Sequence, residues 1–169
     1  MNTMKTMPLD ALMVHIYPHL CSLSGLTPDQ VKEDSKTKKK TIVPLRLHSS
    51  AEKLQRNSIF LLNCGAELLI WVGQAVHPSQ IQEIFGAADF SSLQDGLTVL
   101  PVLDNTLSDI VTSLVEQSRR DQPKFATIRV IKEPSPNRIL FADRLVEDKT
   151  EAAFSYQEFL QHIRNQLSK

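Results

Sequence analysis

The strongest constraint on the fold is one apolar stretch, IFLLNCGAELLIWVG, which runs from Ile59 to Gly73. Eleven of its fifteen residues are apolar, but Asn63, Gly65 and Glu67 interrupt the run. A membrane-spanning helix needs about 20 consecutive apolar residues. Asparagine and glycine tolerate the positive φ angles of tight turns. The stretch therefore predicts a β-hairpin and not a transmembrane helix.

The two strands expected on either side of this turn are Ser58–Leu62 and Leu68–Val72. Neither strand alternates apolar with polar residues. Continuous apolar strands are typical of a sheet that is buried on both faces. We therefore expect helices on both faces of the sheet, and we expect Trp71 to belong to the core and not to a ligand-stacking site.

Other segments are predicted from composition and from proline positions. We expect Leu12–Leu20 to be a strand, with Pro18 placing it at a sheet edge or a bulge. The polar segment Thr27–Lys40 is expected to be a surface loop, and Ile42–His48 to be extended. Phe125–Ile131 supplies a further strand.

Helices are expected where apolar residues recur every three or four positions. Asp104–Arg120 is the clearest case, and Asp104 or Asn105 can cap its start. Pro78 suits the first turn of another helix, which Gly86 ends. Shorter signals predict three more helices. The first begins at the capping box of Ser49 and Glu52, and the second runs from Pro136 to about Ala142. The third is Tyr156–Leu167, which is preceded by the Ser155–Glu158 capping box and the Phe154–Phe159 hydrophobic staple.

This order of elements predicts a single domain of α/β or α+β type. Its mixed β-sheet is flanked by helices on both faces, and a C-terminal helix follows. The length of 169 residues suits one domain, with or without an appendage. The apolar stripe of the last helix suits the core, or a docking face for a larger neighbour.

Composition narrows the functional classes. Lys plus Arg and Asp plus Glu both number 19, so the formal net charge is zero. A whole-chain attraction to nucleic acid or to an acidic membrane is therefore not expected. Cys21 and Cys64 form no Cys-x-x-Cys pair, so we interpret them as free buried thiols in a reducing compartment.

The sequence offers little support for an enzyme. The five glycines lie far apart and form no phosphate loop, and no G-x-S-x-G or H-E-x-x-H motif is present. His15 and His19 have the spacing of a helical metal site, but Pro18 between them and the expected strand argue against it. Cys64 in the hairpin turn is expected to be structural, since no basic partner is identifiable.

The hairpin and its flanks resemble a known family. SIFLLNCGAELLIWVGQAV is similar to the hairpin of the gelsolin-like fold, in which a strand ending near Asp-x-Gly precedes a strand ending in Trp-x-Gly. From about Leu12 onward the chain resembles the C-terminal end of Sec24, the cargo-selecting subunit of the COPII inner coat. The segments that carry this resemblance are YPHLCSLSGL, VPLRLHSSAEKLQRNSIFLLNCGAELLIWVG, IFGAADFSSL, LPVLDNTLSDIV and LVEDKTEAAFSYQEFLQHIRNQL.

The resemblance implies a division of the chain. Residues 1–10 would be a remnant of a preceding helical domain or an added extension, residues 11–150 the gelsolin-like domain, and residues 151–169 a closing helix. The zinc finger, trunk and β-sandwich of full-length Sec24 have no counterpart here, so the chain is expected to be a C-terminal piece without a cofactor.

For function, the resemblance implies a non-catalytic module in cargo selection and endoplasmic reticulum-to-Golgi transport. Its implied partners are Sec23 and cargo export-signal peptides, with no nucleic acid, and its implied place is the cytoplasm, peripheral on the endoplasmic reticulum membrane and on COPII vesicles. Candidate partner-binding residues are the basic clusters, namely Lys38, Lys39, Lys40, Arg119 and Arg120.

The alternative is a free-standing gelsolin-like protein that binds actin under calcium control. The calcium sites of that family use an acidic residue before the first hairpin strand and a carboxylate on the long helix. Here the positions before the strand are Asn57 and Ser58, and the strand ends at Asn63. Calcium favours anionic carboxylates among its oxygen ligands. Glu83 and Asp109 are available acids, but solvated positions are the simpler interpretation.

Overall fold

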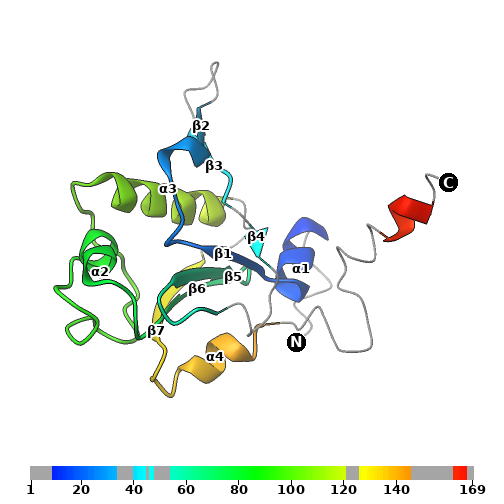
Figure 1. The fold of residues 1–169 in the computed structure, drawn as a ribbon. Coiled ribbons are helices and arrows are strands. Elements are labelled where there is room, and N and C mark those ends of the chain that lie inside the picture. Colours follow the sequence, from blue (N-terminus) through cyan, green and yellow to red (C-terminus); the bar gives the residue numbers. More distant parts are fainter. Residues whose placement is uncertain are drawn as a thin grey trace.

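The computed structural model describes residues 9–33, 40–44, 46–47, 54–120, 126–145 and 162–166. A five-stranded sheet in the order β4-β1-β5-β6-β7 forms its centre, and β2 and β3 form a separate two-stranded sheet (Figure 1). The elements in chain order are α1 (Leu9–Ile16), β1 (His19–Ser22), the 3-10 helix η2 (Pro28–Gln30), β2 (Val31–Glu33), β3 (Lys40–Ile42), β4 (Arg46–Leu47), β5 (Ile59–Asn63), β6 (Glu67–Val72), α2 (Pro78–Phe85), α3 (Thr106–Arg120), β7 (Thr127–Lys132) and α4 (Arg138–Ala142).

The predicted hairpin is confirmed, and it lies in the middle of the sheet. β5 pairs antiparallel with β6, with Phe60 opposite Trp71. In the turn, Gly65 has a φ of 82°, and its N–H donates to Oδ1 of Asn63 at 2.9 Å. Residues with a Cβ are strained at such a φ. The asparagine and the glycine together therefore fix the turn and, with it, the pairing of the two strands.

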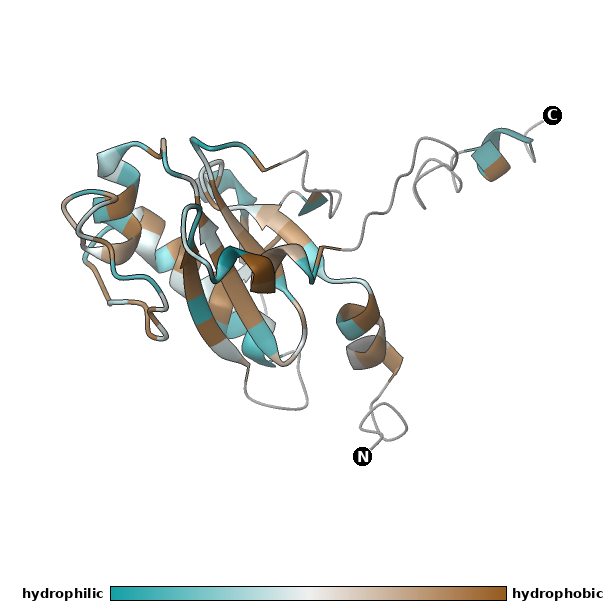
Figure 2. Cartoon of the chain, turned by 90° about the horizontal axis from the view of Figure 1, so that it is seen from below, coloured by the Kyte–Doolittle hydropathy of each residue, from teal (hydrophilic) through white to brown (hydrophobic). Residues whose placement is uncertain are grey.

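Alternate residues of the hairpin pack into two separate cores. Leu61 and Ile70 pack with the buried residues of α2 and α3, whereas Phe60 and Trp71 pack with Phe141 of α4. The rings of Phe60 and Trp71 lie 5.8 Å apart between their centroids. Figure 2 shows the apolar residues running along the strands that these helices cover. The predicted cover on both faces and the core position of Trp71 are thus confirmed.

Strand β7 joins the other side of the hairpin in parallel with β6, with Trp71 opposite Ile131. Parallel neighbours need a long crossover, and here α2 and α3 lie in the connection between them. The strand starts two residues later than the predicted Phe125–Ile131, and Phe125 lies outside the described residues. The sheet is therefore mixed, as the sequence predicts.

The two crossover helices begin and end where the capping residues predict. Pro78 occupies the first turn of α2, and Gly86 ends the helix with a φ of 68°. At the start of α3, Oδ1 of Asn105 accepts the N–H of Ser108 at 2.8 Å. This bond satisfies one of the free N–H groups of the first turn.

The predicted strand at Leu12–Leu20 is wrong over its first part, which belongs to helix α1, and β1 begins only at His19. Proline disfavours a helical conformation in the residue before it, so the helix ends ahead of Pro18. The apolar residues of α1 recur at helical spacing, at Leu9, Met13 and Ile16. All three are exposed, so burial does not identify this helix either.

The polar segment Thr27–Lys40, predicted to be a surface loop, contains regular structure at both ends. η2 and β2 occupy its first part, and β2 pairs antiparallel with β3, with Val31 opposite Ile42. Ile42 is buried in the core on the α3 side, and Val31 packs against that core. These two apolar residues anchor a strand pair whose composition is otherwise polar.

Two predicted features lie wholly or mostly outside the described residues. The helix begun by Ser49 and Glu52 is one of them. Of the predicted helix Tyr156–Leu167, residues 162–166 are described, and they are helical and exposed. In Figure 1 this short helix stands apart from the sheet. The capping box and the staple of residues 154–159 stay predictions.

Candidate interaction site

A pocket of about 240 Å³ opens at the β4 edge of the sheet, between β1, the segment 41–44 and helix α3. Its floor is the side of the strands that faces α3. Arg46, Cys21 and Leu61 form one row across β4, β1 and β5, and His19 and Asn63, two residues along β1 and β5, form the next row on the same face. Residues paired in this way project their side chains to the same face of a sheet. The strand register therefore places the side chains of distant segments next to one another.

One wall of the pocket is fixed by Gln117 of α3. Its Oε1 accepts the main-chain N–H of Ile42 at 2.9 Å, and its Nε2 donates to the Ile42 carbonyl at 3.1 Å. The side-chain amide thus bonds to β3 as a neighbouring strand would. These two bonds attach β3 to the C-terminal half of α3, where Leu114 and Ser118 also line the pocket.

Two basic side chains line the pocket, Arg46 and His19, beside the uncharged Thr41, Asn63 and Ser118. Arg46 Nη1 lies 3.5 Å from His19 Nε2. Burial, followed by the charge of Arg46, lowers the pKa of His19 from its ordinary value of 6.5. The imidazole is therefore neutral at pH 7, and Arg46 supplies the positive charge.

Cys21 lies on the pocket floor but is not suited to be a nucleophile. Its thiol donates to the Leu61 carbonyl at 3.7 Å, and burial raises its pKa to about 12, despite the opposing effect of Arg46. Burial also raises the pKa of Cys64 to about 12. Only the thiolate is strongly nucleophilic. Both cysteines are free and buried, as predicted.

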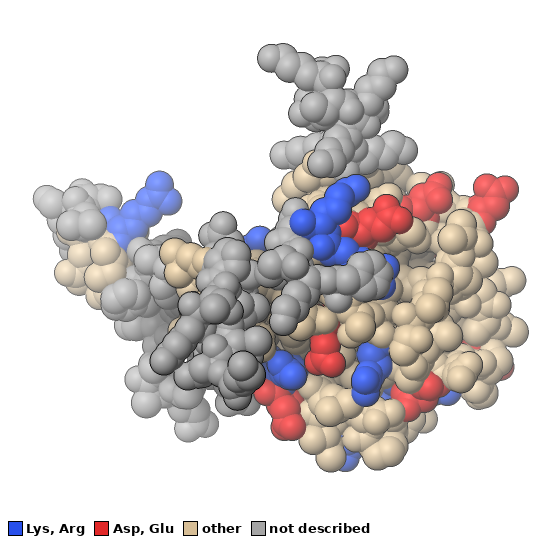
Figure 3. Space-filling model, turned by 180° about the vertical axis from the view of Figure 1, so that it is seen from behind, with Lys and Arg blue, Asp and Glu red and all other residues tan. Residues whose placement is uncertain are grey.

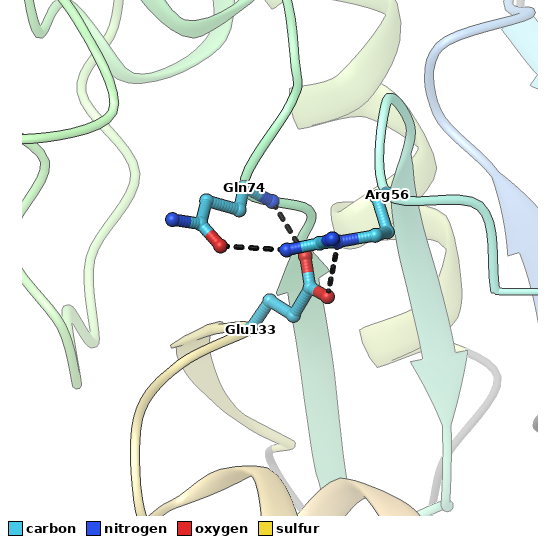
Figure 4. A network of polar contacts seen from close by, with 3 residues as sticks. All are labelled: Arg56, Gln74 and Glu133. Atoms are coloured by element: carbon cyan, nitrogen blue, oxygen red, sulfur yellow. Dashed lines mark hydrogen bonds and ion pairs between the residues drawn. The ribbon is translucent and has the colours of Figure 1, made fainter.

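A second polar cluster lies at the open end of the hairpin, away from its turn (Figure 4). Arg56 pairs through Nε with Oε1 of Glu133 at 2.8 Å and donates through Nη2 to Oε1 of Gln74 at 2.7 Å. The Gln74 N–H closes the triangle by donating to Oε2 of Glu133 at 2.8 Å. The cluster connects the segments before β5, after β6 and after β7, so we interpret it as a contact that stabilises the fold.

Of the predicted partner-binding residues, Arg119 and Arg120 lie at the C-terminal end of α3. Arg119 donates through Nε to the carbonyl of Ala126 at 3.0 Å, which ties the end of α3 to the start of β7. Arg120 is exposed. The main chain of Lys40 belongs to β3, which the Gln117 bonds attach to the same part of α3, while Lys38 and Lys39 lie outside the described residues.

The residues weighed as calcium ligands have other surroundings. The side-chain oxygen of Asn63 is engaged in the hairpin turn. Glu83 and Asp109 are exposed, and the main-chain carbonyl of Glu83 accepts a bond from Asn105 Nδ2 at 2.9 Å. Within the described ranges, no group of three or more His, Cys, Asp or Glu residues is placed to hold a metal ion.

The surface charges are mixed. Figure 3 shows basic and acidic side chains interspersed on the face that it presents, with uncharged areas between them. This distribution agrees with the balanced composition and does not form the single basic stripe typical of nucleic-acid binding. None of the helices that the structure describes combines the length and the apolar character needed to cross a membrane.

Comparison with known proteins agrees with this fold. Residues 40–114 match the family model for the gelsolin repeat. Human protein transport protein Sec24B is 36% identical over 169 residues, which are 100% of this chain and 13% of that protein. Human protein transport protein Sec24A is 33% identical over 170 residues, covering 100% of this chain and 15% of that protein.

The structural comparison points the same way. The crystal structure of the human COPII-coat protein Sec24c matches with a TM-score of 0.74 and 32% identity, over 96% of this chain and 21% of that one. The chain is a homologue of part of Sec24. The resemblance seen in the sequence and the predicted gelsolin-like fold are both confirmed. The chain spans 13% of the length of human Sec24B and 15% of that of human Sec24A.

Sequence reasoning missed the features that define the pocket of this Sec24 homologue. Gln117 is one of several polar residues near the end of the predicted helix, and no neighbouring residue indicates that it bonds to Ile42. Arg46 interrupts the extended segment 42–48, and a charge inside an otherwise apolar strand is the one signal that could have been followed. Its neighbours on β1 and β5 depend on the register, which the sequence alone does not provide.

Proposed function

We propose that this chain is a non-catalytic, structural and protein-binding module of a COPII inner-coat subunit that acts in cargo selection and endoplasmic reticulum-to-Golgi transport. The observation that carries the proposal is the match to Sec24 proteins along the whole chain, with a TM-score of 0.74 to human Sec24c. A non-catalytic role is supported by that homology and by the raised pKa values of both thiols.

The proposal extends to domain limits, partners and location. Residues 11–150 form the gelsolin-like domain, with residues 1–10 belonging to a preceding helical domain or an extension and residues 151–169 forming a closing helix. The module acts without a cofactor of its own. In the complete coat subunit it works alongside Sec23 and export-signal peptides of cargo, on the cytoplasmic side of the endoplasmic reticulum and on COPII vesicles.

Basic side chains at the end of α3 are proposed to contact acidic groups of such partners. Arg120 is exposed, and the Gln117–Ile42 bonds bring β3, with Lys40, to the same part of the helix. Lys38 and Lys39 precede Lys40 in the sequence. Guanidinium groups bind carboxylates with paired, charge-assisted hydrogen bonds. Arg119 is engaged with the Ala126 carbonyl through Nε.

The direct test is to tag the native gene product, measure its size and identify the proteins that co-purify with it. We expect a product much larger than the 19.1 kDa of this chain, co-purifying with Sec23 and concentrating at sites of vesicle formation on the endoplasmic reticulum.

A pair of variants tests the basic residues at the end of α3. An Arg120→Glu variant is expected to lose a co-purifying partner protein. An Arg129→Glu variant, altered on the edge strand β7, is expected to retain that protein. A product of the size of this chain that does not associate with Sec23 would contradict the coat proposal.

The gelsolin-repeat match makes actin the alternative partner to test. Purified chain is mixed with filamentous actin, with and without calcium, and sedimented. We expect no change in the sedimented actin and no calcium dependence, since Asn57, Ser58 and Asn63 replace the expected carboxylates. A calcium-dependent loss of sedimented actin would favour the alternative over the coat module.

A further inference from the structure

The geometry points to a binding site for an aliphatic carboxylate in the pocket between β1, β3, β4 and α3. Arg46 lies in one row of the sheet with Cys21 and Leu61, so its guanidinium stands beside an apolar floor. Ile42 and Leu114 add apolar side chains from β3 and α3, and none of the thirteen residues that line the pocket is acidic. The site therefore offers one positive charge next to a hydrophobic surface.

The hydrogen-bonding groups of the lining narrow the ligand further. Both amide atoms of Gln117 are engaged by Ile42, and the Cys21 thiol is directed at the Leu61 carbonyl. Beside the uncharged side chains of Thr41, Asn63 and Ser118, Arg46 and His19 are the basic donors of the lining. A guanidinium presents donors in a planar fork that matches a carboxylate. Because Arg46 is the one basic group charged at pH 7 in the lining, a singly charged anion fits better than a phosphate.

The size of the pocket limits the apolar part of the ligand. Its volume of about 240 Å³ is below the roughly 300–1,000 Å³ of pockets that take drug-sized molecules. A short aliphatic chain that ends in a carboxylate fits such a space. This chemistry comes from two sources, a free short-chain acid or the C-terminal aliphatic residue of a peptide, and the experiment below separates them.

His19 gives the site a pH signature. It faces Arg46 from β4, the uncharged Asn63 from β5, and the uncharged Thr41 and Gln117 from β3 and α3. A carboxylate bound beside the imidazole favours its protonated form. Binding then takes up a proton, so affinity rises as the pH falls toward the lowered pKa of His19.

The test uses the full 169-residue chain, labelled for NMR, titrated with hexanoate and with the neutral isostere hexanamide. A second arm compares acetyl-Gly-Leu carrying a free C-terminus with the same dipeptide carrying an amidated one. We expect the methyl signals of Leu61 and Leu114 to shift with the carboxylates and not with the amides. A response to hexanoate alone identifies a free acid as the ligand, and a response to the dipeptide alone identifies a peptide terminus. Either response supports the site.

Variants then assign the effect to the pocket. Arg46→Gln is expected to weaken carboxylate binding about tenfold or more, while Arg129→Gln, on the opposite edge strand, leaves it unchanged. His19→Gln is expected to remove the gain in affinity at lower pH. If Arg46→Gln proves unfolded by circular dichroism, Arg46→Lys, which keeps the charge and loses the fork, takes its place with a smaller loss expected.

The inference is overturned if no carboxylate shifts these methyl signals, if the amides shift them equally, or if the Arg46 variants bind as the unaltered chain does. It does not depend on the proposed coat function. Co-purification with Sec23 and carboxylate binding by the isolated chain are separate measurements, so either can fail without the other.

Discussion

Gly73 lies against the main chain of Arg56 so closely that a Cβ at position 73 would collide with the Arg56 carbonyl. The same carbonyl accepts the N–H of Ala75 at 2.8 Å, and the Arg56 side chain binds Glu133 and Gln74 (Figure 4). The end of β6 and the entry to β5 are therefore in direct backbone contact, and glycine at position 73 is what permits that contact.

We expect Gly73→Ala to lower the free energy of unfolding by at least about 1–3 kcal/mol, because the obstructing atoms are main chain and cannot rotate away. Urea unfolding followed by circular dichroism measures the change. Gly25→Ala is the matched control, since a Cβ there would meet no atom within 4 Å. Equal stability of the two variants would contradict the close-contact explanation.

The Gln117 bonds to Ile42 give a second prediction. Gln117→Leu keeps the size of the side chain but leaves the N–H and carbonyl of Ile42 without this partner, so we expect a loss of about 1–3 kcal/mol. Amide hydrogen exchange at Ile42 is expected to accelerate in the variant. Gln82→Leu, at an exposed position of α2, is expected to change stability by less than about 0.5 kcal/mol. Unchanged exchange at Ile42 would show that Gln117 does not anchor β3.

A third prediction concerns Asp95, whose carboxylate accepts bonds from the Lys132 N–H at 3.0 Å, Ser135 Oγ at 2.6 Å and Asn137 Nδ2 at 2.9 Å. Burial alone would raise the pKa of Asp95, but these bonds outweigh it and hold the pKa below 3.8. The contribution of the group to stability is therefore present above pH 3.8 and is lost as the pH falls through the lowered value.

We accordingly expect Asp95→Asn to destabilise the protein at pH 7 and to have much less effect near pH 2. Urea unfolding at both values measures the difference. Asp143→Asn, at an exposed site after α4, is the control and is expected to show little change at either pH. A loss in the Asp95 variant that is the same at pH 7 and pH 2 would mean that its charge is not responsible.

The cap of α3 gives a fourth prediction. Asn105 accepts the Ser108 N–H through Oδ1 and donates through Nδ2 to the Glu83 carbonyl, so it also connects α3 to α2. We expect Asn105→Ala to cost about 1 kcal/mol of unfolding free energy. Asn105→Ser, which keeps a capping oxygen, is expected to recover part of the loss. Thermal unfolding compares the two, and equal melting temperatures would rule out a capping role.

The elements that the sequence predicts correctly are those whose signals are local. The hairpin is marked by two continuous apolar runs around an Asn-x-Gly turn, and α3 by its apolar period and its cap at Asn105. In both cases the residues that specify the element also make the decisive contacts within it. Tertiary packing then adds to a structure that the neighbouring residues already favour.

The elements that were predicted wrongly have no clear local signal. Some depend on contacts with distant residues, and one has an apolar face that is exposed. Helix α1 has few residues and an exposed apolar face, so neither burial nor length distinguishes it from a strand. Strands β2 and β3 occupy a polar segment and are anchored by Val31 and Ile42 in the core below α3. The pocket was missed for the same reason, because the neighbourhood of Arg46 is created by strand register and by Gln117, 71 positions further along the chain.

The position of the hairpin in the sheet affects where this fold can be cut. The gelsolin-repeat match covers residues 40–114, yet the strands on either side of the hairpin are β1 at His19–Ser22 and β7 at Thr127–Lys132. A fragment trimmed to the matched segment would keep the hairpin and lose the partner strand on each side of it. Two rows of unpaired main-chain groups would then be open to other chains. We therefore expect a fragment limited to residues 40–114 to aggregate more readily than the full chain.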